Sequence, residues 1–339
     1  MNQSLIKVLV TAAGGDLGQA VIKCLRLGTA HYEIHGGDMQ QGGISTLFVE
    51  HFHSLPSAGS ADYVEQLDAL CRAHQIAAVI PCSEAEIRRL CALETHPVLP
   101  CGARIVSQSP QINAIYGDKL KCFQILHGKV PLADFTDAKE RATAEKFIAR
   151  HDFPLCMKER VSSGMMGVLI LKDADEFALK WPHFSLPLLQ TLIDGDEREY
   201  SIGVFTHGTE TRLISYRRRL GPLGCSWFAE LDQPEVVLDY CRRIASVVNA
   251  QGSINIQLRN SQNGPLLLEI NPRFSSLAAA RAACGFNDVE WSVLQALDLE
   301  LPPAQPPPVA FRYQRYIAES VDFGTGLHVP QAWAPRMGA

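Results

Sequence analysis

The sequence predicts an α/β protein that opens with a parallel, doubly wound sheet and continues into α+β and antiparallel parts. Over residues 1–112, short apolar runs alternate with helical patterns, as they do in parallel sheets. Over residues 113–190, two strands flank a loop of small residues beside helices, which indicates a small α+β segment. Over residues 191–339, strand patterns follow one another closely, which indicates an antiparallel sheet.

The N-terminal segment shows the order strand, turn, helix most clearly. Residues 6–11 (IKVLVT) form an apolar, β-branched run, AAGGDLG follows as a Gly-rich turn, and Gln19–Leu27 is amphipathic. Further elements expected here are the strand Tyr32–Gly36, the helix Tyr63–His74, the strand Ala77–Pro81 and the helix Glu84–Leu93. This alternation predicts helices on both faces of one parallel sheet.

The two later segments contain shorter elements. The expected elements of residues 113–190 are the helix Asp118–Leu126 and the strands Pro154–Lys158 and Val168–Leu171. Those of residues 191–339 are the strands Tyr200–Phe205, Thr211–Arg219, Ile254–Arg259 and Leu266–Asn271, helices over 234–250 and 287–298, and a last strand Phe311–Ile317 after the connector LPPAQPPP.

Composition argues against several classes of protein, among them non-specific nucleic-acid binders and membrane proteins. The net charge of −5 argues against a non-specific nucleic-acid binder, whose signature would be a basic face. No apolar run reaches the roughly 18 residues of a membrane helix, and the first residues lead straight into a strand, so we expect a cytoplasmic protein. The 10 cysteines are dispersed and form no C-x-x-C pair, which argues against a zinc site or a disulfide framework.

The stretch INIQLRNSQNGPLLLEINPRFS predicts a β-hairpin, because its Asn-Gly pair stands between two alternating runs. If residues 262–264 form a three-residue loop, Ser261 faces Pro265 and Gln257 faces Glu269.

Strand alternation then places Glu269, Asn271 and Arg273 on one face of the hairpin, with Leu268 and Ile270 on the other. The carboxylate and the amide oxygens beside it suit Mg²⁺, which prefers hard oxygen ligands. Arg273 is suited to clamp a phosphate group. The alternative to a metal site is an ordinary amphipathic hairpin whose polar face is exposed to solvent.

A lysine precedes a loop of small residues in PLCMKERVSSGMMG. Lys158 ends an apolar strand, and Ser162, Ser163, Gly164 and Gly167 follow. Small residues let backbone N–H groups approach phosphate oxygens, and a lysine adds a point charge. No Walker A pattern occurs in the chain. A flexible hairpin turn is the alternative interpretation.

Three other segments carry weaker signals. Lys119, near the start of a helix, reads by itself as a surface lysine. The segment from Gln190 to Glu199 resembles a hinge whose backbone reads an adenine edge while Glu199 takes ribose hydroxyls, although Glu199 equally suits a solvated strand position. In SYRRRLG, Arg217 and Arg219 share one face of a strand. Two guanidinium groups on one face are suited to bind an anionic substrate or the γ-phosphate. The alternative is a basic, exposed edge strand.

Together these segments resemble the ATP-grasp superfamily, and most closely the synthetase halves of the carbamoyl-phosphate synthase large subunit and related short carboxylate–amine ligases. The resemblance covers nearly the whole chain, from IKVLVTAAGGDLG through VIPCSEAEI and GDKLKCFQIL to LLLEINPRFSSLAAARAACGFN. The segment EINPRFS followed by A-x-x-x-x-G-F is its most specific part.

The resemblance implies three domains: a pre-ATP domain (1–112), a small α+β lid (113–190) and an antiparallel core (191–339). It implies ATP contacts from Lys119, Lys158, Ser163, Gly164, Gly167, Gln190, Thr191, Leu192, Ile193 and Glu199. It implies Mg²⁺ ligands at Gln257, Glu269 and Asn271, with Mn²⁺ as an alternative ion, and Arg273 facing the transferred phosphoryl group. Lys158, Arg217, Arg219 and Arg273 form the expected catalytic set.

The chain departs from the family pattern at several positions. Glu159 stands where the family usually has proline, and Met165 and Met166 stand where glycines are common. The linker before Glu199 is longer than usual, so Glu197 competes for the ribose role. The chain matches a single synthetase unit without a glutaminase segment, which favours a stand-alone ligase.

The expected reaction is ATP-dependent ligation of a small carboxylate to an amine or a thiol through an acyl phosphate, without nucleic-acid or membrane partners. A homodimer is a common state among proteins of this resemblance. One alternative is an NAD(P)-dependent oxidoreductase, because Gly15, Gly18 and Asp38 mimic part of a dinucleotide fingerprint, with Ala13 replacing its first glycine. The other is a non-catalytic nucleotide-binding regulator.

Overall fold

The computed structural model describes residues 5–40, 43–162, 167–194, 198–221, 224–317, 319–322, 327 and 329. The chain divides into two compact units. Unit 1 consists of the residues up to Pro110, Arg273–Val309 and the residues from Gln314 onward, and unit 2 consists of Gln111–Pro272 and Ala310–Tyr313. None of the helices in the described residues is both long enough and apolar enough to cross a membrane.

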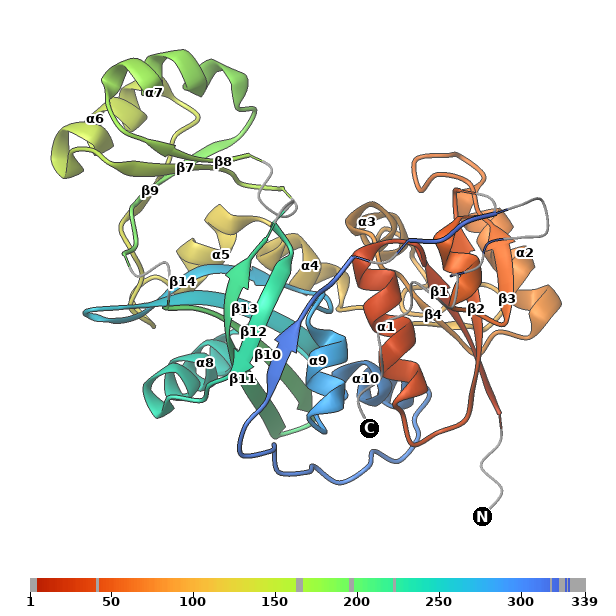
Figure 1. Cartoon of the computed structure of the whole chain (residues 1–339). Coiled ribbons are helices and arrows are strands. Elements are labelled where there is room, and N and C mark those ends of the chain that lie inside the picture. Colours follow the sequence, from red (N-terminus) through yellow and green to blue (C-terminus); the bar gives the residue numbers. More distant parts are fainter. Residues whose placement is uncertain are drawn as a thin grey trace. The chain divides into compact units, whose positions relative to one another are not determined.

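Unit 1 is built on a five-stranded parallel sheet with the order β3-β2-β1-β4-β5 (Figure 1). Its strands are β1 (Ile6–Thr11), β2 (Tyr32–Asp38), β3 (His51–Ser54), β4 (Ala78–Ile80) and β5 (Arg104–Ile105). Its helices are α1 (Asp16–Arg26), α2 (Tyr63–His74), α3 (Glu84–Cys91), α9 (Ala278–Ala283) and α10 (Asp288–Ala296), with a 3₁₀ turn η1 (Ile44–Leu47). The predicted parallel sheet is confirmed.

Alternation along β1 explains why helices cover both faces of this sheet. Val8 and Val10 pack with residues of α1, α9 and α10 on one face. Leu9 points to the other face, where it packs with residues of α2 and α3 such as Tyr63 and Leu90. Both faces are therefore buried, as a doubly wound sheet requires. The helix expected over 287–298 is present, and the contacts of α9 and α10 with α1 belong to unit 1.

Unit 2 contains a six-stranded sheet with the order β14-β13-β10-β11-β12-β15 and a four-stranded sheet with the order β6-β9-β7-β8. The larger sheet consists of β10 (Glu199–His207), β11 (Glu210–Leu220), β12 (Ser226–Leu231), β13 (Gly252–Ser261), β14 (Gly264–Asn271) and β15 (Arg312–Gln314). The smaller one consists of β6 (Phe135–Asp137), β7 (Leu155–Glu159), β8 (Val168–Leu171) and β9 (Pro187–Thr191). The helices are α4 (Pro110–Tyr116), α5 (Lys119–Leu126), α6 (Arg141–His151), α7 (Ala174–Lys180) and α8 (Glu235–Val248), with a 3₁₀ turn η2 (Trp181–His183).

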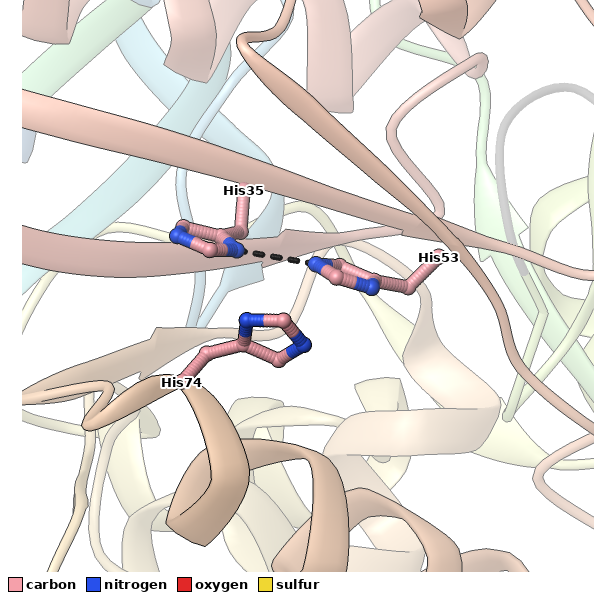
Figure 2. A group of neighbouring side chains, drawn as sticks. All are labelled: His35, His53 and His74. Atoms are coloured by element: carbon pink, nitrogen blue, oxygen red, sulfur yellow. Dashed lines mark hydrogen bonds between the residues drawn. The ribbon is translucent and has the colours of Figure 1, made fainter.

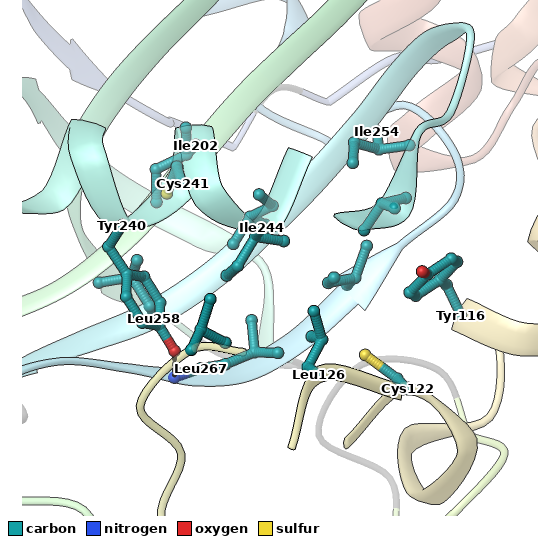
Figure 3. Packing of buried hydrophobic residues seen from close by; sticks show 14 of the residues in the cluster. Tyr116, Cys122, Leu126, Ile202, Tyr240, Cys241, Ile244, Ile254, Leu258 and Leu267 are labelled. Carbon is teal, nitrogen blue, oxygen red and sulfur yellow. Dashed lines mark hydrogen bonds between the residues drawn. The ribbon is translucent and has the colours of Figure 1, made fainter. Parts of the chain in front are cut away.

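One face of the larger sheet forms the main core of unit 2. Ile202 of β10, Ile254 and Leu258 of β13 and Leu267 of β14 pack against α5 and against Tyr240 and Ile244 of α8 (Figure 3). The Tyr240 hydroxyl donates to the Pro131 carbonyl at 2.6 Å and accepts from the Leu267 N–H at 3.1 Å, so this buried hydroxyl is fully used. The opposite face of these strands is left for polar side chains.

The β13–β14 hairpin differs from the prediction at its turn. Ser261 pairs with Gly264, so the loop has two residues and the expected pairing of Ser261 with Pro265 is wrong. The register then shifts after Gln257, where Leu268 is the extra residue of a β-bulge. The bulge restores the predicted pairing of Gln257 with Glu269. It also moves Leu268 off the buried face, where Leu267 and Ile270 lie instead.

Gly18→Ala is expected to destabilise unit 1. A β-carbon on Gly18 would lie 2.3 Å from the Ala12 carbonyl oxygen and 2.8 Å from the Ala13 Cα, and backbone atoms cannot move aside as a flexible side chain does. Overpacking costs about 1–3 kcal/mol, which outweighs the gain of up to about 1 kcal/mol in helix propensity. The midpoint of thermal unfolding should fall by several degrees. Gly59→Ala is the control, since the nearest atom, Ser57 Oγ, is 3.8 Å away; equal midpoints for the two variants would contradict the prediction.

Candidate active site

The polar face of the β13–β14 hairpin carries the predicted metal ligands. Gln257 stands opposite Glu269, and Asn255 stands opposite Asn271. The Asn271 side-chain amide donates to Glu269 Oε1 at 3.0 Å, which confirms that these two residues share a face. Carboxylate and amide oxygens are therefore gathered on two adjacent strands, a set suited to a hard cation.

Lys119 reaches this hairpin from the start of α5. Its side chain is buried, and Nζ lies 3.4 Å from Glu269 Oε2. Nζ also lies 3.4 Å and 3.2 Å from the carbonyl and hydroxyl oxygens of Ser162. The interpretation of Lys119 as a surface lysine is wrong, because α5 packs on the sheet and directs its first residue toward Glu269.

Lys158 and Gln190 meet in the smaller sheet of unit 2. Antiparallel pairing of β7 with β9 sets Lys158 beside Leu188, two residues from Gln190 on the same face. Lys158 Nζ donates to Gln190 Oε1 at 2.7 Å, and both side chains are buried. Burial lowers the pKa of Lys158, partly offset by Cys156 and Glu269. Gln190 Nε2 is buried without a hydrogen-bond partner among the described residues.

Arg160, which the sequence analysis missed, fixes the start of α5. Asp118 caps this helix by accepting from the backbone N–H groups of Leu120 and Lys121. Arg160 binds both carboxylate oxygens of Asp118, at 3.1 Å and 2.7 Å, and its carbonyl accepts from the Lys119 N–H. The segment after β7 is thereby tied to the helix that carries Lys119. The sequence analysis places Asp118 inside the helix, whereas it is the residue that caps it, and no local pattern indicates its distant arginine partner.

Glu199 is held by two further arginines that the sequence analysis did not select. Glu199 Oε1 accepts from Arg218 at 2.9 Å and 3.1 Å, and Oε2 accepts from Arg259 at 3.3 Å. Arg218 also donates to Gln257 Oε1 at 2.6 Å, and Arg259 donates to the Ile193 carbonyl at 2.9 Å. The predicted ribose ligand and one predicted metal ligand are thus linked through Arg218.

Arg217 and Arg219 do not lie on this polar face. Arg217 pairs across the sheet with Tyr200, whose neighbour on β13 is Leu258 of the apolar core. Arg217 forms an ion pair with Glu230, and the Arg219 guanidinium lies 4.6 Å from the centre of the Phe228 ring. The predicted alternation is confirmed, and the arginine beside Glu199 and Gln257 is Arg218. The role expected of Arg217 and Arg219 stays a prediction.

Arg273 lies beyond the end of β14, in the segment that returns to unit 1. Its guanidinium donates to Glu84 Oε1 at 3.4 Å and 3.1 Å and to the Phe274 carbonyl at 3.0 Å. The strand alternation that predicted its position on the hairpin ends at Asn271. The role assigned to Arg273 stays a prediction.

The loop after β7 is described only in part. Ser163, Gly164 and the two methionines lie outside the described residues, as does Glu197. Gly167 has φ +74°, and a β-carbon there would lie 2.9 Å from Glu159 Cγ. The Glu159 carboxylate accepts from the backbone N–H groups of Ser185 and Leu186, at 2.6 Å and 3.0 Å. This glutamate thus binds the segment that leads into β9, a role proline could not fill.

Thr191, Leu192 and Ile193, which are expected to contact ATP, lie at the end of β9 and just after it. Thr191 ends β9, and its N–H donates to the Asp134 carbonyl at 2.9 Å. Leu192 is 38% exposed, whereas Ile193 is buried. The nucleotide contacts expected of these three residues stay predictions.

In unit 1, Asp38 is engaged by the Gly-rich turn. Its Oδ2 accepts from the Gly14 N–H at 2.9 Å and its Oδ1 from the Gln40 N–H at 3.2 Å. Gly18 lies so close to the Ala12 backbone that a larger side chain would clash, so packing alone accounts for a glycine at this position. The dinucleotide-like pattern therefore has a structural explanation that needs no nicotinamide cofactor.

Residues 184–318 match the family model described as "ATP-grasp in the biosynthetic pathway with Ter operon". A search of the curated proteins gave no match to this chain.

Solved structures resemble the whole fold. N5-carboxyaminoimidazole ribonucleotide synthetase from Thermus thermophilus has a TM-score of 0.69 at 15% identity, covering 91% of this chain and 82% of that one. The biotin carboxylase domain of Hydrogenobacter thermophilus 2-oxoglutarate carboxylase has a TM-score of 0.71 at 14% identity, covering 88% and 71%. Biotin carboxylase from Campylobacter jejuni has a TM-score of 0.68 at 13% identity, covering 88% and 72%. The match of residues 184–318 to an ATP-grasp family model and the likeness of the fold to these structures agree with the ATP-grasp resemblance of the sequence.

Proposed function

We propose that this chain ligates a small carboxylate to an amine through an acyl phosphate, with ATP as co-substrate and Mg²⁺ as its metal; a thiol acceptor is the variant of the same chemistry. The observation that carries the proposal is the presence of two buried lysines, Lys119 and Lys158, in one site with Glu269. Lys119 pairs with Glu269 directly, and the charge of Glu269 also acts on Lys158.

The residues present fit the phosphates and the base of ATP. A buried ammonium group is costly unless an anion compensates it, and the partner of Lys158 is a neutral amide oxygen. A phosphate chain would supply the missing negative charge. The Gln190 amide nitrogen, buried without a partner among the described residues, fits an acceptor on the adenine edge or its neighbouring phosphate.

The hairpin fits Mg²⁺. The ligands would be oxygens of Gln257, Glu269 and Asn271, a hard set that leaves positions for phosphate and water. Arg218 orients Gln257, and Lys119 orients Glu269, so partners outside the ligand set already hold two of the three side chains. Bound Mg²⁺ would neutralise phosphate charge during phosphoryl transfer.

In the proposed reaction, a carboxylate oxygen of the substrate attacks the γ-phosphorus of ATP, the bond to the β-phosphate oxygen breaks, and ADP leaves. The amine then attacks the acyl carbon, loses a proton, and phosphate departs. The chain positions the reactants and neutralises charge through Lys119 and Lys158. Arg273, in the segment that follows the hairpin, keeps its proposed role toward the transferred phosphoryl group.

The structural neighbours support the nucleotide and the metal. The H. thermophilus domain was solved as a dimer with MgADP, ADP and bicarbonate, and the C. jejuni enzyme with an ATP analogue. By extension we propose Mg-ATP for this chain, with a homodimer as its assembly. Identities of 13–14% support the fold and leave the carboxylate and its acceptor to experiment.

Isothermal titration of ATP and of NAD, each with and without Mg²⁺, tests the nucleotide. We expect Mg²⁺-dependent ATP binding and no NAD binding. A screen for ADP release with pooled acids, bicarbonate, amines and thiols then tests the reaction. NAD binding without ATP binding would overturn the proposal, and ATP binding without ADP release from any pool would favour the regulator.

Glu269→Gln is expected to reduce Mg²⁺-dependent ATP turnover at least about 100-fold, since loss of an outer-shell partner alone costs 10–100-fold. Glutamine keeps the size of the side chain and an oxygen for Lys119 and Asn271. Titration of activity against Mg²⁺ provides the measurement. Glu230→Gln, on the other face of the same sheet, is the matched control, and similar activity in both variants would exclude Glu269 as a metal ligand.

Lys158→Met is expected to weaken Mg-ATP binding about 10- to 100-fold. A hydrogen bond to a charged group contributes about 1.5–3 kcal/mol, and 1.4 kcal/mol corresponds to a factor of ten. The unfolding midpoint of the free protein should not fall, because burial already disfavours the charged lysine. The exposed Lys172→Met is the control in the same titration; unchanged affinity in the Lys158 variant would refute the phosphate contact.

Arg218→Met is expected to lower both the unfolding midpoint and the affinity for Mg-ATP, whereas Arg217→Met changes neither appreciably. Removing one partner of a buried ion pair costs about 3–5 kcal/mol, and an exposed pair contributes about 0–1 kcal/mol. Differential scanning calorimetry and nucleotide titration measure the two effects. A loss of nucleotide affinity confined to the Arg217 variant would restore the original assignment.

A further inference from the structure

A cluster of histidines lies in unit 1, outside the candidate active site. Glu33 and His35 alternate along β2, and His51 and His53 alternate along β3, the edge strand of the sheet. Parallel pairing places His35 beside His51, so all four side chains share one sheet face. His35 also pairs with Leu9, which identifies this face as the one that α2 covers. His74, the last residue of α2, completes the cluster.

Three of these rings converge. Figure 2 shows His35, His53 and His74 directed toward one another from β2, β3 and α2. One ligand nitrogen from each lies within 4.8 Å of those of the other two. His35 Nδ1 and His53 Nε2 are 2.8 Å apart. In a tetrahedral zinc site with bonds of 2.0–2.1 Å, ligand nitrogens are separated by about 3.3 Å. To hold a zinc ion, His35 and His53 would therefore have to separate by about half an ångström, and His74 would have to bring its nitrogen, now within 4.8 Å, to a similar distance from both.

We propose that His35, His53 and His74 form a binding site for a transition-metal ion of the zinc class. Imidazole nitrogens suit zinc, copper and nickel, whereas magnesium and calcium prefer oxygen. Three imidazoles leave the fourth position of a tetrahedral ion to water, which the partly exposed His53 and His74 permit.

Glu33 supplies the partner that a metal-binding histidine usually has. Its carboxylate lies 3.0 Å from His35 Nε2. A carboxylate accepts, so Nε2 carries the proton and Nδ1 presents its lone pair toward the cluster. This carboxylate–histidine arrangement fixes ring orientation in many metal sites.

The existing hydrogen bond between His35 and His53 is compatible with metal binding. With the His35 Nδ1 lone pair as acceptor, His53 Nε2 is the donor. Transfer of the His53 proton from Nε2 to Nδ1 gives the other neutral tautomer and exposes the second lone pair, with no net change of charge.

The bound ion would join the edge strand β3 to β2 and to the C-terminal end of α2. We expect one Zn²⁺ per chain when full-length protein, stripped with a chelator and kept reduced, is titrated with Zn²⁺, and a higher unfolding midpoint with the metal present. Mg²⁺ and Ca²⁺ should produce neither effect. X-ray absorption should show nitrogen or oxygen at about 2.0 Å and no sulfur at about 2.3 Å, which separates this site from the cysteines.

Two variants at partly exposed positions test the ligands without disturbing the buried His35. His53→Ala and His74→Ala should each weaken Zn²⁺ binding at least 100-fold, and Glu33→Gln should weaken it 10- to 100-fold. His207→Ala, at an exposed position in unit 2, is the control and should bind Zn²⁺ as the wild type does. The midpoint of the metal-free variants should stay near that of the metal-free wild type. Absence of stoichiometric binding, sulfur in the coordination shell, or full affinity in the His53 and His74 variants would overturn the proposal.

Discussion

The ion pair between Lys119 and Glu269 is the constraint on which the candidate active site depends. It joins the start of α5 to β14 across a distance of 3.4 Å, and the same ammonium group reaches Ser162 in the segment after β7. Three parts of unit 2 that are far apart in sequence therefore meet at one buried cation. Because an unpaired buried charge is costly, this arrangement strongly restricts where α5 and the hairpin can lie.

A second layer of arginines supports this pair. Arg160 holds Asp118, which caps the helix carrying Lys119, and Arg218 and Arg259 hold Glu199 from the neighbouring strands. Each arginine makes bidentate or bridging contacts, which fix geometry better than single hydrogen bonds do. The polar face is thus arranged by groups that need not touch a ligand themselves. Such preorganisation is what transfer of a charged group requires.

The two units present different ligand chemistry. The hairpin of unit 2 offers a carboxylate and amide oxygens, which match a hard ion bound together with phosphates. The cluster of unit 1 offers imidazoles backed by Glu33, which match a softer ion. The two proposed sites therefore favour different classes of metal ion.

Local sequence determined the elements and much of the fold. The run IKVLVT, the Asn-Gly turn and the EIN segment each predict their strand from alternation and turn chemistry, and the facing of Gln257 with Glu269 followed from them. The predicted turn was one residue too long. Strict alternation allows no extra residue in a strand, so the prediction placed in the turn the residue that the structure places in a β-bulge at Leu268.

What the sequence by itself determined is therefore the order of the elements, the parallel sheet of unit 1 and the residues of the hairpin. Only the tertiary structure decided which face of β11 meets Glu199, because alternation separates Arg218 from Arg217 and Arg219 but does not say which side faces that carboxylate. It alone decided the burial of Lys119 and the partners of Asp118, since both arise from packing between distant segments. It alone assembled the histidines, because residues 35, 53 and 74 become neighbours only when parallel strands and a covering helix bring them together.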